Sequence, residues 1–244
     1  MDLRKGFHEP QDKPRRFYRT VSVCVLEGGW GVELDGRRLR TPQAMPLVLP
    51  VRALAEQVAE EWAAQSVVIE LATMHATRLA NTAIESIAGV REAIADQIAD
   101  YAASDLLCYF AAAPQALVER QRLGWEPVLQ RIEHEEGVQF QRAVGIVHRP
   151  QADTTLTRIR DISLQLNDFQ LAGLAFGVSL FGSAILGVAL FRGWLTPDMA
   201  FELSRLDEAF QESLWGVDAD AAERTARLGR EARVLEQWFR ALET

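Results

Sequence analysis

The sequence predicts an α+β protein in which a small β-rich N-terminal domain precedes a larger helical domain. Two patterns predict this class. Short alternating apolar segments separated by turn residues occupy the chain up to about residue 50, and apolar residues spaced three or four apart follow. The chain has 244 residues, of which 48% are hydrophobic and 25% charged, as in globular proteins with one large core or two ordinary ones.

The domain organisation follows from the change of pattern. We expect a flexible tail over residues 1–15, a β-containing domain with one helix over residues 16–70, and a helical bundle over residues 71–244. The first twenty residues have no apolar stretch like that of a secretory signal, and they carry acids that organellar presequences avoid.

Residues 16–49 predict a small antiparallel sheet. Valines alternate with other residues over positions 21–25, which is the period of a half-buried strand. A second run of strand-like pattern over residues 30–34 ends at Asp35-Gly36, a strong hairpin signal. The segment is long enough for about three or four strands.

From Val51 onward the apolar spacing is typical of helices. One stripe runs through Val51, Leu54, Val58 and Trp62. The later helical segments begin with 77–87 and 90–101, continue from Pro114, and end with 154–166, 169–191, 197–215 and 218–242. Pro127, inside the segment that Pro114 opens, predicts a kink or a split because proline removes a backbone donor.

Residues 171–191, LAGLAFGVSLFGSAILGVALF, contain no charge, amide or histidine. About 20 apolar residues can span a bilayer as a helix, so a membrane-tethered adaptor is one interpretation. The chain has no second segment of this kind, and the amphipathic helices on both sides need an apolar partner. We therefore expect an enclosed core helix and no stable membrane insertion.

Charge and cysteine content limit the partners. Beyond residue 40, Asp and Glu outnumber Lys and Arg by 28 to 17, which argues against nucleic acid as a partner. Cys24 and Cys108 are the only two cysteines, too few and too far apart for a disulfide framework or a zinc site. This usage suits a reducing compartment.

The sequence contains none of the common phosphate-loop, dinucleotide, serine-hydrolase or zinc-protease motifs. A soluble enzyme using His134 and Glu135 is the alternative interpretation, because the HEEG stretch holds groups that move protons or bind metals. Such residues, with Glu136, more often form the solvated last turn of a helix before a glycine, here Gly137. We expect no catalytic residue, no metal and no cofactor.

The segment TPDMAFELSRLDEAFQESLWG predicts a helix with a distinctive polar edge. Thr196 is expected to cap it, and a core face is expected through Leu203, Leu206, Phe210 and Leu214. Asp207 lies at the rim of that face. Its carboxylate is therefore either paired with an arginine of a neighbouring helix, such as Arg78, or available to a partner.

Gln211 and Trp215 follow Asp207 at steps of four residues and extend the same ridge, while Glu208 points away from the core face. An acid, an amide and an indole in a row suit protein recognition, in which aromatic anchors and specific polar contacts carry binding.

Several stretches, in order from about Arg16 to Trp215, resemble one family. They are RFYRTVSV, DGRRLRTP, PLVLP, LAEQVAEEWAAQ, ATRLANTAIE, YAASDLLCYF, LVERQRLGWEPVL and LSRLDEAFQESLWG. Together they are similar to the assembly chaperones that act on the α subunit of the F1 sector of ATP synthase.

The resemblance implies a protein without catalytic activity, built as a small β-containing domain followed by an orthogonal helical bundle. It implies binding to the unassembled α subunit at the surface later taken by the β subunit. The family's functionally sensitive acid corresponds to Asp207, followed here by Glu208, and we expect Gln211 and Trp215 to join them in binding the partner. Trp62 matches a family tryptophan that we interpret as a packing anchor.

The resemblance also implies a location and a state. We expect the protein in the bacterial cytoplasm, with eukaryotic relatives in the mitochondrial matrix, and we expect a monomer when the partner is absent.

Overall fold

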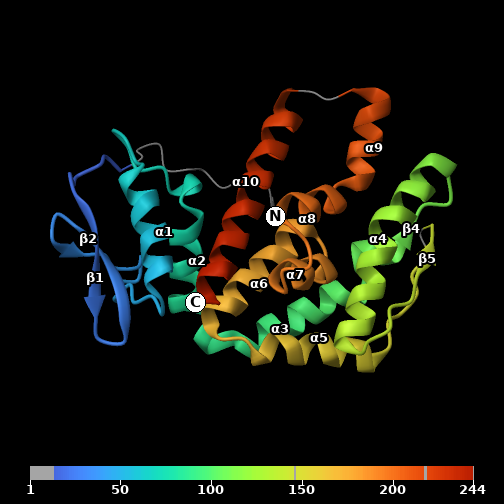
Figure 1. Ribbon diagram of the computed structural model, residues 1–244, viewed down its shortest axis with the longest axis horizontal. Coiled ribbons are helices and arrows are strands. Elements are labelled where there is room, and N and C mark those ends of the chain that lie inside the picture. The colour runs from blue at the N-terminus through green and yellow to red at the C-terminus, as the bar shows by residue number, and fades with distance from the viewer. Residues whose placement is uncertain (1–13, 146, 217–218, 244) are drawn as a thin grey trace, which may run out of the picture. The chain divides into compact units, whose positions relative to one another are not determined.

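The computed structural model describes residues 14–145, 147–216 and 219–243, and its contacts divide the chain into two compact units, Met1–Asn81 and Thr82–Thr244 (Figure 1). The predicted flexible tail, residues 1–15, lies outside the described residues except for its last two. These two residues, Pro14 and Arg15, pair with the segment before the helical unit. The Pro14 carbonyl accepts a hydrogen bond from the Ile69 amide at 2.8 Å, and Arg15 forms a β-bridge with Val68.

The N-terminal unit contains the predicted small antiparallel sheet, with strand order β1-β2-β3. Its strands are β1 (Val21–Leu26), β2 (Gly29–Leu34) and β3 (Arg37–Arg38). In the register of β1 and β2, Val21 lies opposite Leu34 and Leu26 opposite Gly29, so only two residues form the turn. The Asp35-Gly36 turn then leads into β3, as its sequence predicts.

Helix α1 (Arg52–Ala63) packs on both long strands. It buries Leu54, Val58 and Trp62, three members of the predicted stripe, and its core partners on β2 include Val32. The Tyr18 hydroxyl donates a hydrogen bond of 2.7 Å to the Trp62 carbonyl, which ties the chain before β1 to the end of α1. The packing role predicted for Trp62 is therefore confirmed.

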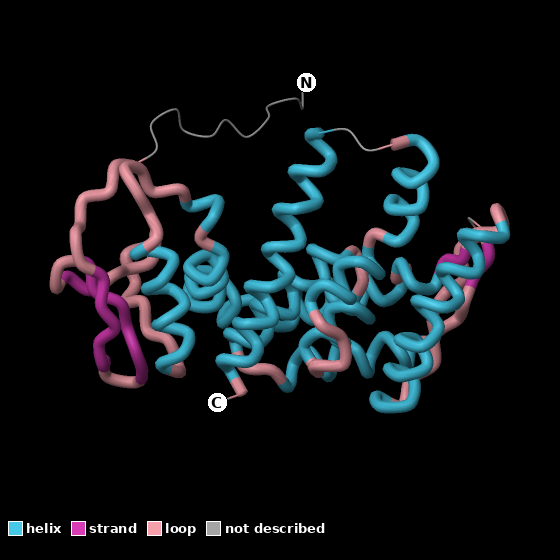
Figure 2. Tube along the Cα trace, turned by 45° about the horizontal axis from the view of Figure 1, so that its top comes forward, coloured by secondary structure: helices cyan, strands magenta, loops and turns pink. Residues whose placement is uncertain are grey.

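The C-terminal unit is predominantly helical (Figure 2). Its helices are the π-helical turn Ala83–Ile87, α3 (Ala88–Ala103), α4 (Gln115–Glu136), α5 (Asp153–Gln165), α6 (Asp168–Phe181), α7 (Ala184–Phe191), α8 (Pro197–Ser204), α9 (Leu206–Trp215) and α10 (Ala219–Leu242). Shorter elements are α2 (His75–Thr82), which ends at the division between the units, the 3-10 turns Leu71–Thr73 and Leu106–Cys108, and the parallel strands β4 (Tyr109–Phe110) and β5 (Ala143–Val144). The split predicted at Pro127 is wrong, because α4 continues through that residue as one helix.

The centre of this unit is formed by α6 and α7. Every residue of α7 from Ala184 to Leu190 is buried, and α6 packs against α3, α7 and α10. Residues 171–191 lie mostly in the core, as expected, apart from the exposed Ser179 and Gly182, but the single helix predicted over 169–191 is wrong. Gly182 adopts φ of 64°, a conformation that glycine tolerates best, and Ser183 starts a new helix by accepting from the Leu186 amide. Among the described helices, none is both long and apolar enough to cross a bilayer.

A buried carboxylate holds this helix break. Asp105 is 0% exposed and accepts hydrogen bonds from the Ser183 hydroxyl at 2.7 Å, the Ile185 amide at 3.0 Å and the Leu107 amide at 3.1 Å. Burial raises the pKa of Asp105 from 3.8 to about 6, although these hydrogen bonds lower it. This residue was not predicted from the sequence. Its signal was Gly182-Ser183, a helix end followed by a cap, inside an otherwise apolar run.

Candidate partner-binding surface

The segment predicted as one helix over 197–215 is also two helices. The chain leaves helical geometry at Arg205, with φ of −114° and ψ of 18°, so α9 takes a new axis. Phe210 is the one residue of α9 that is buried, and Leu214 is 59% exposed. The predicted core face is therefore wrong at Leu214, because a helical wheel drawn through Arg205 assumes one straight axis.

Asp207 is half-buried at the start of α9, and its partner is an amide of the same unit. Its Oδ1 accepts a hydrogen bond of 2.7 Å from Gln121 Nε2. Gln121 is fully buried on α4, and its Oε1 accepts from the Ala111 amide, also at 2.7 Å. The side-chain contact found for Asp207 is thus with Gln121, and the arginine alternative does not describe it.

The charge on Asp207 is poorly compensated. Burial raises the pKa of this carboxyl, the hydrogen bond from Gln121 lowers it, and the nearby charge of Glu208 raises it further. A neutral amide donor fixes the orientation of the carboxylate without neutralising it. Such a group still gains by meeting a cation or further N–H donors.

Helix α4 supplies the support beneath α8 and α9. Trp125, which is fully buried, donates from Nε1 to the Leu203 carbonyl at 3.0 Å, at the end of α8. The guanidinium of Arg120 lies 5.2 Å from the ring centre of Phe210, the anchor of α9. These contacts fix the root of α9 and leave its last turn open to solvent.

The other predicted residues lie on the exposed side of α9. Glu208 and Gln211 are exposed, and Trp215 is 83% exposed. The Trp215 indole N–H donates to Gln211 Oε1 at 3.2 Å, so the amide and the indole form one unit on the ridge. Leu214, which sequence reasoning assigned to the core, adds a second apolar side chain beside Trp215.

The residues of the enzyme alternative are not gathered into a site. His134 and Glu135 are exposed, and a neighbouring cleft of about 390 Å³ is lined by Glu133 but not by them. Glu136, expected in a solvated turn, is buried and paired with Arg158 at 3.0 Å and Arg192 at 2.9 Å. The solvated-turn prediction is wrong for Glu136, because long-range arginines compensate its burial.

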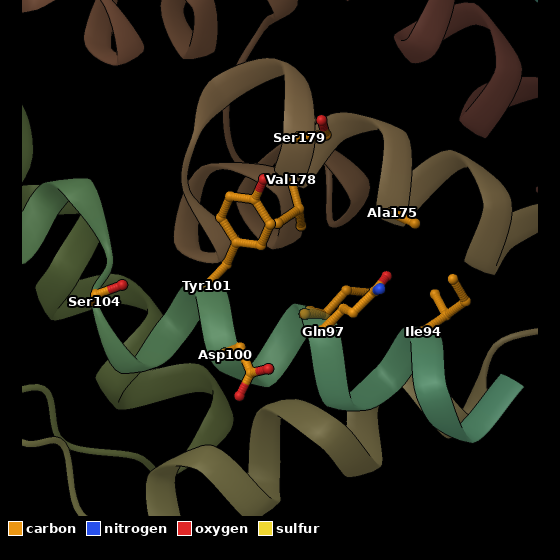
Figure 3. A pocket seen from close by; sticks show the side chains of 9 residues that line it. Ile94, Gln97, Asp100, Tyr101, Ser104, Ala175, Val178 and Ser179 are labelled. Carbon is orange, nitrogen blue, oxygen red and sulfur yellow. The ribbon is translucent and has the colours of Figure 1, made fainter. Parts of the chain in front are cut away.

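A groove of about 500 Å³ lies between α3 and α6 (Figure 3). In Figure 3 the Tyr101 ring extends from α3 toward Val178 of α6, and Asp100 is the one carboxylate in the lining. One acid in an open groove does not form a general acid–base pair. Over the described residues, no cluster of three or more His, Cys, Asp or Glu side chains is placed to hold a metal ion.

A small sheet followed by a helical unit is the organisation that the resemblance to the assembly chaperones implies. Comparison with known proteins identifies the family. The ATP12 chaperone protein family matches residues 15–133. A curated relative, the mitochondrial protein atp12 of Schizosaccharomyces pombe, is 27% identical over 226 residues, which span 88% of this chain and 78% of the relative.

Solved structures extend the match over nearly the whole chain. Two structures of Atp12 from Paracoccus denitrificans, one of them an aspartate-to-lysine variant, are 40% identical, cover 93% of this chain and 97% or 98% of their own, and have TM-scores of 0.86. A protein of Agrobacterium tumefaciens is also 40% identical, with 94% of this chain and 86% of its own covered and a TM-score of 0.89. The chain belongs to the ATP12 chaperone family, the ATP synthase assembly chaperones that its motifs resemble.

Proposed function

We propose that this protein binds the unassembled α subunit of the ATP synthase F1 sector through α9 and holds it until the β subunit takes its place. The binding residues are Asp207, Glu208, Gln211 and Trp215, now joined by Leu214. The protein makes and breaks no covalent bond in this role and needs no cofactor. It acts in the compartment where the α subunit awaits assembly, the cytoplasm in bacteria and the matrix in mitochondria.

The observation that carries the proposal is the contrast between the root and the tip of α9. At the root, Gln121 orients the Asp207 carboxylate, and at the tip Trp215 is 83% and Leu214 59% exposed. An exposed tryptophan and an oriented charge on one helix are the kinds of residue that form binding hot spots. A free ring subunit exposes apolar interface that drives aggregation, and α9 offers an apolar cover for it.

The polar groups explain how such a complex remains reversible. A chaperone that covers an interface must bind well enough to prevent aggregation and still lose to the proper partner. Oriented charges add specificity and speed of association more than affinity, whereas a large apolar surface would hold the client too tightly. A small apolar tip with acidic neighbours meets both requirements.

The test is co-expression with the α subunit, measuring the soluble fraction of that subunit and its retention on the tagged chaperone. We expect Asp207→Lys and Trp215→Ala each to reduce retention by at least about tenfold, the loss typical of a hot spot. Asp207→Asn keeps the shape and the Gln121 contact, so it tests the charge alone.

Matched controls separate binding from folding. Glu223→Lys makes a comparable charge reversal at an exposed position of α10, and Leu123→Ala removes an apolar side chain that is 61% exposed on α4. Both controls should retain the α subunit. Equal retention by wild type, Asp207→Lys and Trp215→Ala, with all three folded by circular dichroism, would exclude α9 as the binding surface.

A further inference from the structure

The outer edge of β1 is a second surface with recognition chemistry. β1 is the first strand in the sheet order β1-β2-β3, so only one of its edges pairs within the sheet. Its six residues, VSVCVL, include no charge and no proline. Val25 is 71% exposed although it lies opposite Trp30, on the face that α1 covers.

The hydrogen bonds between β1 and β2 show which backbone groups of β1 face outward, because alternate residues of an antiparallel strand bond to its neighbour. The Asp35 amide donates to the Thr20 carbonyl at 3.0 Å, so the even-numbered residues of β1 face β2. On the far side of β2, the backbones of Trp30 and Leu49 exchange hydrogen bonds of 2.8 and 2.7 Å. The even-numbered residues of β2 therefore face away from β1, which agrees with this assignment. The N–H and C=O groups of the odd residues, Val21, Val23 and Val25, therefore point away from the sheet.

Proteins normally protect such edges with charged side chains, prolines or bulges, because a row of outward donors and acceptors pairs with another strand. β1 carries none of these protections along its length. Among the described residues, no backbone hydrogen bond outside the sheet reaches Val21, Val23 or Val25. A second strand can therefore add to this edge.

The residues flanking β1 are complementary to themselves. In an antiparallel pairing of two copies with Val23 opposite Val23, each Val21 lies opposite Val25 of the other copy. Past the ends of the strand, the same register brings the bend that holds Arg19 of each copy toward the turn that holds Glu27 of the other. Arg19 and Glu27 are both exposed, and they carry opposite charges. Cross-strand apolar pairs and opposite charges both stabilise such a pairing.

We propose that two copies of this chain associate through β1 into a two-fold symmetric dimer with a continuous six-stranded sheet. The two-fold axis passes between the two Val23 residues, so every contact occurs twice, as in isologous interfaces. The pairing covers the exposed Val25 with Val21 of the second copy. This dimer departs from the monomer expected for the free protein, and it does not depend on the proposed role of α9.

The interface is short, so the dimer is weak. A single six-residue strand pair is a small interface beside the roughly 1,200 Å² that stable complexes bury. We therefore expect a dissociation constant between about 10 µM and about 1 mM. The association is therefore visible only as the protein concentration rises.

Sedimentation equilibrium of the full chain over that range tests the proposal. Wild type should shift from monomer to dimer. Arg19→Glu or Glu27→Arg alone should weaken association by roughly tenfold, since each reverses two symmetric pairs, and the double variant should restore it. Val23→Pro should abolish the dimer and leave the fold intact, because the amide it removes is not bonded within the sheet.

Amide hydrogen exchange adds a readout that needs no variant. The segment Val21–Leu26 should become protected as the concentration of the protein increases. A chain that remains monomeric throughout would overturn the proposal. So would a dimer indifferent to all these substitutions, or protection of β1 that appears only when the α subunit is added.

Discussion

The helix breaks at Gly182-Ser183 and at Arg205 are similar locally but differ in their surroundings. Both interrupt a segment whose sequence reads as one helix, and both lie near a carboxylate that a neutral side chain holds, Asp105 by Ser183 and Asp207 by Gln121. After the first break, every residue from Ser183 to Leu190 is buried. After the second, α9 leaves the core with Phe210 as its one buried residue.

The difference lies in how many donors meet each acid. Asp105 receives three donors and is fully buried, so its site is saturated and internal. Asp207 receives one side-chain donor and keeps part of its surface in solvent. A saturated acid stabilises a fold, whereas an oriented and partly unsatisfied acid is suited to an external partner.

The largest expected effect is at the enclosed break. Asp105→Ala leaves the Ser183 hydroxyl and the amides of Ile185 and Leu107 buried without their acceptor. We expect the free energy of unfolding to fall by about 3 kcal/mol or more, measured by urea denaturation. Asp105→Asn keeps one acceptor oxygen, so its free energy of unfolding should fall by less. A loss below about 1 kcal/mol for alanine would mean that the break does not depend on the acid.

The pH dependence of stability sharpens the same contrast. The folded pKa of Asp105, about 6, is above its ordinary value of 3.8, so the folded chain binds this proton more tightly. Its stabilising contribution is complete below the ordinary value and is lost as pH rises through about 6. Relative to that of Asp105→Asn, the free energy of unfolding of the wild type should fall by roughly 1.4 kcal/mol between pH 5 and pH 8. If the difference in free energy of unfolding between the two proteins did not vary with pH, the raised pKa of Asp105 would be contradicted.

The smallest effect is expected at the exposed helix. Trp215 is 83% exposed, so Trp215→Ala should change the free energy of unfolding by less than about 0.5 kcal/mol. The same denaturation measurement checks it, beside the loss of α subunit retention in the binding assay. A large loss of stability would show that Trp215 packs internally and would remove the contrast between the two breaks.

Local sequence patterns were sufficient for most of the fold. Alternation at residues 21–25 and the Asp35-Gly36 turn predicted the hairpins, and the stripe ending at Trp62 predicted the buried face of α1. These patterns succeed because strand and helix periods are set by neighbouring residues. The predicted site residues do lie together on α9, since four-residue steps on one helix need no long-range information.

The hydrogen bonds that orient the key acids involve residues far away in the sequence. Gln121 is 86 residues from Asp207, and Asp105 is 78 residues from Ser183, separations at which the sequence contains no spacing signal. The exposure of Leu214 was missed for the same reason, because it follows from the break at Arg205. That break redirects α9 away from the packed helices.

By itself, the sequence determined the α+β class, the periodic elements, the family resemblance and the identity of the acidic and aromatic ridge. The tertiary structure alone decided where long apolar segments break, which acid is saturated and which strand edge is left open. The physical reason is that periodicity records which side of an element is apolar. Hydrogen-bond saturation and exposure depend instead on which distant groups the completed fold brings within reach.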